Sequence, residues 1–206
     1  MGERFQGWPE EAQRFFVGLQ LDNSKAYFEA HRATYLRCVR GPMEALIAAT
    51  EPEFGPSKLF RANRDIRFRA DKSPYRTDVA ATVGDCWVSL SASGLTVASG
   101  WYHVDRPWLE RYRAAAADER SGADLAALLA SLESDGFDIW GRELKVVPRP
   151  YSRDHPRARL LRHKWLGVGR QFGLQPWLGT PEALDRVVDA WRAARPVVDW
   201  VRVNVG

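Results

Sequence analysis

Three strand-like segments separated by two short turn signals lie in the middle of the chain, and they constrain the fold most strongly. β-Branched and aromatic residues are frequent in the segments 77–83, 87–91 and 95–103. Gly84-Asp85 and Ser93-Gly94, which separate them, are residue types that close tight turns between antiparallel strands. The sequence therefore predicts an antiparallel meander of three or more strands.

Segments with helical periodicity flank these strands on both sides. Their apolar residues recur every three to four positions over 8–19, 24–39, 43–51, 105–117, 121–135 and 180–195. Gly41-Pro42 and Pro52 are expected to interrupt the early helices, and Pro196 to stop the last one. Weaker patterns predict a strand at 144–147, a short helix at 156–163 and a late strand at 165–172. Helices grouped before and after strands, rather than alternating with them, predict an α+β fold in which helices cover the sheet.

The length of 206 residues suits one sizeable core, and no repeat or low-complexity linker divides the chain, so we expect a single domain over 1–206. Nine tryptophans spread along the chain are expected to be separate core anchors. No secretory start and no apolar run of about 20 residues occur, which predicts a cytoplasmic protein without a membrane partner. Cys38 and Cys86 stand alone and are expected to be small buried residues.

The formal net charge of +4 is unevenly distributed. Segment 57–78 carries seven cations against three acids, and segment 142–170 carries nine against two. If the two segments meet, they form a positive field that would concentrate phosphate groups, nucleotides or nucleic acid. The alternative is two separate solvated loops.

Common catalytic and cofactor signatures do not occur. The run from Gly167 to Gly173 is not a dinucleotide loop because its third glycine comes one residue late. Phosphate-binding loops, zinc-protease helices and serine-hydrolase elbows are absent from the sequence, and the four histidines are scattered. We therefore expect no cofactor and no metal site. His31, on an aromatic helical stripe, is expected to be a hydrogen-bonded core residue rather than a base.

Residues 60–69 can form an extended strand with two unlike faces. One face would carry Phe60, Ala62, Arg64, Ile66 and Phe68, and the other Arg61, Asn63, Asp65, Arg67 and Arg69. Arg64 stands on the apolar face, where an unpaired guanidinium would cost several kcal/mol. We therefore expect Arg64 to be paired with a carboxylate, with carbonyl oxygens or with a bound anion.

The pattern Arg-x-x-Arg-Asp-x-Arg-Phe-x-x-Asp-Lys-x-x-Tyr, from Arg61 to Tyr75, resembles the hallmark of a bacterial family of unknown function, domain family 2461. The resemblance extends to Gly7-Trp8, to the helix start from Asn23 to Phe28, and to Gly100-Trp101-Tyr102. It implies kinship over most of the chain, but it supplies no reaction, ligand or catalytic residue.

The motif has two interpretations. In the functional one its side chains converge on an anionic ligand, with the candidate residues Arg61, Arg64, Asp65, Arg67, Lys72, Tyr75 and Arg76. In the structural one, ion pairs and Tyr75 hold an irregular loop against the helices, with a turn at Ser73-Pro74. Secondary candidates for the ligand are His31, Arg149 and Lys164.

Three functions remain open at the level of sequence. The first is binding, with or without turnover, of a small anionic or phosphorylated molecule; no nucleophile or carboxylate pair identifies catalysis. The alternative is single-stranded nucleic-acid binding through 57–78 and 142–170, where cations alternate with aromatic residues such as Tyr151 and Trp165. The third is an interaction protein without a pocket.

Overall fold

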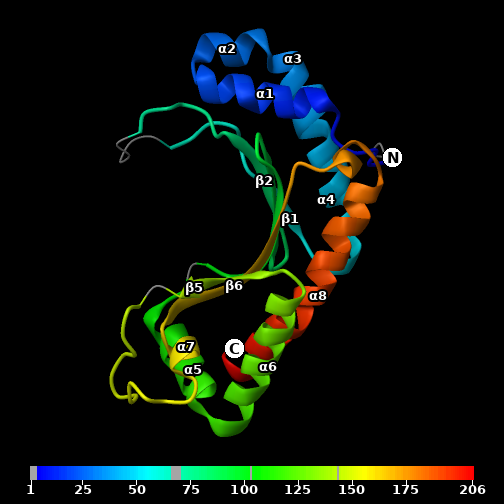
Figure 1. Ribbon diagram of the computed structural model, residues 1–206. Coiled ribbons are helices and arrows are strands. Elements are labelled where there is room, and N and C mark those ends of the chain that lie inside the picture. The colour runs from blue at the N-terminus through cyan, green and yellow to red at the C-terminus, as the bar shows by residue number, and fades with distance from the viewer. Residues whose placement is uncertain (1–3, 66–70, 103, 143) are drawn as a thin grey trace. The chain divides into compact units, whose positions relative to one another are not determined.

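The computed structural model describes residues 4–65, 71–102, 104–142 and 144–206 and confirms an α+β fold (Figure 1). Within these residues the strands form a six-stranded sheet in the order β1-β2-β3-β4-β6-β5. The strands are β1 Ser57–Leu59, β2 Asp78–Val83, β3 Cys86–Ser91, β4 Gly94–Trp101, β5 Asp138–Arg142 and β6 His163–Gly173. The predicted meander is confirmed, since β2, β3 and β4 are neighbours in chain order and β2 pairs antiparallel with β3 from Asp78↔Ser91 to Val83↔Cys86.

Helices precede and follow the strands, as expected. The helical segments before the meander are α1 Glu10–Leu21, α2 Lys25–Ala30, α3 Arg32–Thr34, η1 Tyr35–Arg40 and α4 Gly41–Phe54. Those after it are α5 Arg106–Ala117, α6 Glu119–Ser134, α7 Ala158–Leu161, η2 Pro176–Gly179 and α8 Glu182–Asn204. Two starts are capped as their sequences suggest: Ser24 accepts a hydrogen bond from the Tyr27 N–H and Asp105 from the Trp108 N–H. None of the helices in the described part of the chain is long and apolar enough to cross a membrane.

The chain groups into two compact units. The first comprises Met1–Val97 and Gln171–Asp189, and the second Ala98–Arg170 and Ala190–Gly206. β4, β6 and α8 each supply residues to both units. This grouping does not test whether the units fold separately, so the single domain stays a prediction.

Aromatic rings form much of the core of the first unit. α1 buries Ala12, Phe15, Phe16 and Leu19 on one face, which is the predicted apolar stripe. The Phe15 ring lies 5.5 Å from Tyr35 and 5.9 Å from Phe28. This cluster joins α1, α2 and η1 and provides the wall against which the Arg-rich motif packs.

The core of the second unit is built around Tyr112 of α5. Its ring stacks on Trp108 at 5.4 Å, and its hydroxyl donates to the Leu160 carbonyl. Trp200 packs edge-on against the same ring and donates its indole N–H to the Ser121 carbonyl. Trp8, Trp108, Trp191 and Trp200 are buried and act as the expected core anchors, whereas the other five tryptophans are half-buried. Cys38 and Cys86 are buried free thiols, as predicted.

Three prolines do not end helices where the sequence predicts. At Gly41-Pro42 the chain stays helical because η1 is a π-helical segment, in which the Gly41 N–H donates to the Leu36 carbonyl five residues back. This wider turn makes room for the Pro42 ring, which would clash with the carbonyl four residues back in an α-helix. Pro52 lies in the last turn of α4, which reaches Phe54. α8 continues through Pro196, because burial of Val197, Val198, Trp200 and Val201 outweighs a cost of about 3 kcal/mol.

Other boundaries also differ from the predictions. α6 begins two residues earlier than Ser121, because the carboxylate of Asp118 accepts hydrogen bonds from the Arg120 and Ser121 N–H groups. Residues 144–147 are not a strand, and β5 at Asp138–Arg142 pairs with β6 instead. Of the strand expected along 60–69, residues 60–65 lie outside β1 and make only an isolated bridge at Asn63, while residues 66–70 lie outside the described residues.

Candidate functional site

The Arg-rich motif extends β1 and β2 as an irregular antiparallel arm, which we define as residues 60–65 and 71–77. The Phe60 N–H donates to the Ala80 carbonyl, the Arg76 N–H to Ala62 and the Arg64 N–H to Pro74. Leu59 pairs with Ala81, and Asn63 pairs with Tyr75. Between these two pairs, the three residues 60–62 therefore face the five residues 76–80. Such a bulge redirects side chains and is common beside functional sites.

Asn23, in the turn between α1 and α2, holds the arm to the helices. Its Oδ1 accepts a hydrogen bond from the Tyr75 N–H at 3.0 Å, and its Nδ2 donates to the Tyr75 carbonyl at 3.1 Å. The Tyr75 ring stacks on Phe28 with a centroid distance of 4.0 Å and an interplanar angle of 3°. Tyr75 is 5% exposed and is not among the residues that line the pocket described below. The structure therefore places this candidate in the core, as an anchor of the arm.

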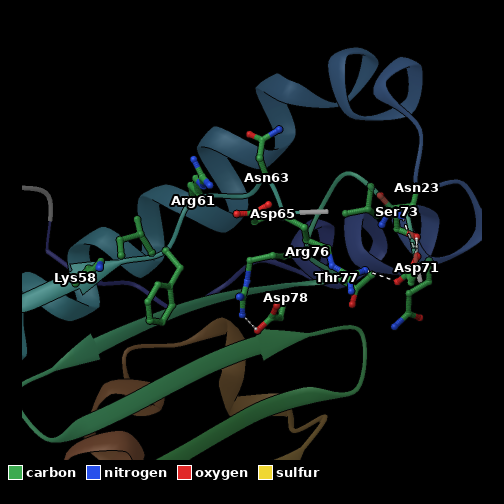
Figure 2. Close-up of a pocket in the computed structure, with 15 residues that line it drawn as sticks. Asn23, Lys58, Arg61, Asn63, Asp65, Asp71, Ser73, Arg76, Thr77 and Asp78 are labelled. Carbon is green, nitrogen blue, oxygen red and sulfur yellow. Dashed lines mark hydrogen bonds and ion pairs between the residues drawn. The ribbon is translucent and has the colours of Figure 1, made fainter. Parts of the chain in front are cut away.

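A pocket of about 900 Å³ lies between the arm and α1 in the first unit (Figure 2). α1 and the turn that follows it contribute Leu19, Gln20 and Asn23. β1 and the arm contribute Lys58, Leu59, Phe60, Arg61, Asn63, Arg64, Asp65, Asp71, Ser73, Arg76, Thr77 and, at the start of β2, Asp78. This volume lies in the usual range for small-molecule sites.

Arg64 has a carboxylate partner, as the sequence analysis predicts. Its side chain is 21% exposed and forms an ion pair with Asp71 at 2.5 Å. Asp71 also accepts hydrogen bonds from the Ser73 N–H at 2.9 Å and from its hydroxyl at 2.6 Å. The Ser73 hydrogen bonds and the Arg64 guanidinium together hold the pKa of Asp71 well below its usual range. This pair closes the arm and is ionised at neutral pH.

Arg76 is held at the base of the arm by a second ion pair. Its guanidinium contacts Asp78 at 2.9 Å, and Asp78 also accepts a hydrogen bond from the Ser89 hydroxyl at 2.9 Å. The guanidinium lies over the Phe60 ring at 5.5 Å. Its Nε is buried and has no acceptor among the described residues. Arg76 is therefore rigidly placed while one of its hydrogen-bond donors is unused.

Two cations of the pocket lack an ion pair. Lys58 and Arg61 are exposed, and neither has a carboxylate partner in the part of the chain that the structure describes. The described residues of the lining include four cations and three carboxylates. Because Arg64 and Arg76 are paired with Asp71 and Asp78, Lys58 and Arg61 are the cations of this described lining without an ion pair.

The arm brings together four of the predicted ligand residues, namely Arg61, Arg64, Asp65 and Arg76. Lys72 is exposed and does not line the pocket, and Arg67 lies outside the described residues. His31 is exposed, so its predicted place in the core is wrong. The apolar stripe of α2 turns away from the core at this position, and the His31 ring stacks on Tyr27 at 4.1 Å instead. Arg149 and Lys164 are exposed residues of the second unit.

Sequence reasoning did not select several residues that the structure places in the pocket. Lys58 and Asp78 were counted only as charges, and Asn63 only as a member of the polar face. The spacing Asp71-x-Ser73 is typical of a turn in which a carboxylate accepts from the N–H two residues later, and it could have revealed the Asp71 site.

Part of the second basic segment has a structural role within the second unit. The Arg157 guanidinium donates to the carbonyls of Ala116 and Ala117, which are the last residues of α5. Arg159 forms an ion pair with Glu133 of α6. These two cations stabilise helix ends and helix contacts, so they are already engaged.

Comparison with known proteins gives a match at the level of the family. The family model described as conserved hypothetical protein (DUF2461) matches residues 11–200, a range that includes Asn23 and the whole arm. The family resemblance inferred from the sequence is thus confirmed. No curated protein and no solved structure matches the chain.

Proposed function

The chain belongs to the family described as conserved hypothetical protein (DUF2461), and since that description names no activity, we propose its function from the geometry of the site. The protein binds a small anionic ligand in the pocket beside the arm. The proposal is limited to binding, because the described residues of the lining include no cysteine or histidine and the Ser73 hydroxyl donates to Asp71.

The observation that carries the proposal is the pair of cations, Lys58 and Arg61, that line one pocket and have no carboxylate partner among the residues that the structure describes. An anion bound beside either cation would compensate its charge. A guanidinium and an ammonium are also the side chains that bind phosphate and carboxylate oxygens most strongly.

The fixed parts of the arm favour binding over a merely solvated loop. Asn23 and Tyr75 hold the arm to α1 and α2, and the pairs Arg64–Asp71 and Arg76–Asp78 fix its shape. A site whose side chains are ordered before the ligand arrives loses less conformational entropy on binding.

Isothermal titration calorimetry with inorganic phosphate at about 50 mM salt tests the proposal. We expect saturable binding by the unaltered protein and about 10- to 150-fold weaker binding by Lys58→Gln and by Arg61→Gln, because each variant loses charge-assisted hydrogen bonds of about 1.5–3 kcal/mol. Arg106→Gln is the matched control: it makes the same change of charge at a side chain of the second unit that is 89% exposed.

Two results would contradict the proposal. Either the unaltered protein shows no saturable binding of phosphate or pyrophosphate, or Arg106→Gln weakens binding by the same factor as the pocket variants. The second result would indicate a general effect of net charge rather than a site.

Single-stranded nucleic-acid binding is the second candidate, and an aromatic pair in the second unit favours it. The Tyr102 side chain is 66% exposed, its ring lies 4.9 Å from Trp165, and Lys164 is exposed beside it in sequence. An exposed aromatic ring next to a cation suits base stacking and phosphate contact. Affinity for a single-stranded oligonucleotide should then fall steeply between about 50 and 200 mM salt, and a flat response would remove this candidate.

A further inference from the structure

The arm presents a row of three chemically different side chains to the pocket. Arg61, Asn63 and Asp65 are exposed, whereas the intervening Ala62 and Arg64 are half-buried. This alternation is that of an extended chain, in which every second side chain points the same way, about 7 Å apart. All three line the pocket and are labelled in Figure 2. A guanidinium, an amide and a carboxylate therefore follow one another along one face of the arm.

The chemistry of this row favours a ligand with two unlike ends. Arg61, together with Lys58, attracts an anionic group. Asp65 accepts hydrogen bonds only and repels an anion, while Asn63 both donates and accepts. A ligand that extends from Arg61 toward Asp65 thus needs a negative group at one end and uncharged hydrogen-bond donors at the other.

Hydroxyl groups suit the second end better than an ammonium. The described residues of the lining include one more cation than carboxylate, so a further positive charge in the pocket would be repelled. The half-buried Leu59 and Phe60 supply apolar surface against which the C–H face of a sugar can pack. A pocket of about 900 Å³ also exceeds what a phosphate ion alone fills.

We infer that the ligand is a phosphorylated sugar or polyol whose phosphate lies at Lys58 and Arg61 and whose hydroxyl groups contact Asn63 and Asp65. This inference rests on the proposed function, because it assigns a chemical class to the ligand of the same pocket.

Calorimetric titration with matched probes tests the assignment. The probes are inorganic phosphate, glucose 6-phosphate, ribose 5-phosphate, glycerol 3-phosphate and free glucose. At least one of the three phosphorylated probes with hydroxyl groups should bind about tenfold more tightly than inorganic phosphate, the gain expected from one well-placed hydrogen bond to a charged group. Free glucose should bind more weakly than that probe, because it lacks the anionic end.

Variants then separate the two ends of the site. Asp65→Asn should remove the advantage of the phosphorylated sugar while leaving inorganic phosphate binding unchanged or slightly tighter, because one negative charge is lost. Asn63→Ala, at an exposed side chain, should reduce the same advantage and provides a second variant if Asp65→Asn unfolds. Asp124→Asn, an exposed residue of α6, makes the same charge change and should alter nothing.

The outcomes distinguish this inference from the proposal on which it rests. If inorganic phosphate binds but no sugar or polyol phosphate binds more tightly, the ligand is a simple anion and only the present inference fails. The present inference alone also fails if Asp65→Asn and Asn63→Ala weaken the binding of all phosphate-containing probes equally. If none of these probes binds, the proposed function itself fails.

Discussion

At the scale of single residues, the arginines of the motif divide into two groups. Arg64 and Arg76 have carboxylate partners, and their pairs shape the arm. Arg61 has none among the described residues and is available to a ligand. The structural interpretation of the motif therefore holds for Arg64 and Arg76, whereas ligand binding at Arg61 is the proposal made above.

His163 of β6 permits a prediction about pH at this scale. It is 1% exposed, and burial, with the nearby Arg142 and Arg159, lowers its pKa to about 4. The folded state thus favours the neutral ring, whose Nδ1 contacts the Trp165 carbonyl. From α5, the Tyr112 ring lies beside the imidazole, and the Arg113 guanidinium contacts the His163 carbonyl. Its contribution to stability is complete above pH 6.5 and is lost as pH falls from 6.5 toward 4.

We expect this loss to amount to about 3 kcal/mol of unfolding free energy between pH 7 and pH 4. Urea denaturation of the unaltered protein and of His163→Gln across this range measures it, because the variant lacks the titrating ring and its pH dependence should be shallower. Equal slopes for His163→Gln and the unaltered protein would refute the assignment.

At the scale of elements, the glycines that resemble a dinucleotide loop have a packing role in β6. Trp140 of β5 pairs with Gly167, and its ring lies over Gly169, where a Cβ would come within 2.3 Å of the indole. The Trp165 ring similarly covers Gly167, whose Cβ would lie 2.8 Å away. Gly167-Val168-Gly169 therefore lets indole rings lie against the strand backbone while Val168 remains in the core.

Gly169→Val should consequently destabilise the protein by about 1–3 kcal/mol, because the added side chain displaces the Trp140 ring. Urea denaturation measures the change, and Gly179→Ala, where the added Cβ would be 3.6 Å from its nearest neighbour, should stay within about 0.5 kcal/mol of the unaltered protein. In the background of Trp140→Ala, the cost of Gly169→Val should largely disappear. Additive losses would show that the two residues do not interact.

At the scale of the whole molecule, the two units share structural elements. The chain passes between them at three points, and each crossing lies inside β4, β6 or α8. Unfolding one unit alone would interrupt the hydrogen bonding of two strands and a helix in their middle. Partial unfolding of this kind has a high free energy, which favours cooperative unfolding of the whole chain despite its division into units.

We therefore predict one unfolding transition for the whole chain. In urea, the midpoints from far-ultraviolet circular dichroism and from tryptophan fluorescence should coincide, since the two units both contain tryptophans and helices. Saturating phosphate should move both signals together, because a ligand of the first unit then stabilises the entire chain. Two separate transitions would instead show that the units are independent domains.

Features that depend on neighbouring residues along the chain could be predicted from the sequence. Apolar periodicity indicated the helices, strand-like composition with turn residues between the segments indicated the meander, and alternation placed Arg61, Asn63 and Asp65 on one face of the arm. These features follow from backbone geometry and hydrogen bonds within a few residues. The need for a partner at Arg64 was also predictable, since an unpaired guanidinium is costly wherever it is partly buried.

The partner of each side chain depends instead on contacts between segments that are distant in sequence. Asn23 meets Tyr75 across 52 positions, and the ring of Tyr75 is buried against Phe28 rather than turned to the pocket. Helix α8 continues through Pro196 because distant side chains bury the residues beyond it. In each case, packing between segments far apart in sequence outweighs a local preference of at most a few kcal/mol, and no local pattern records that balance.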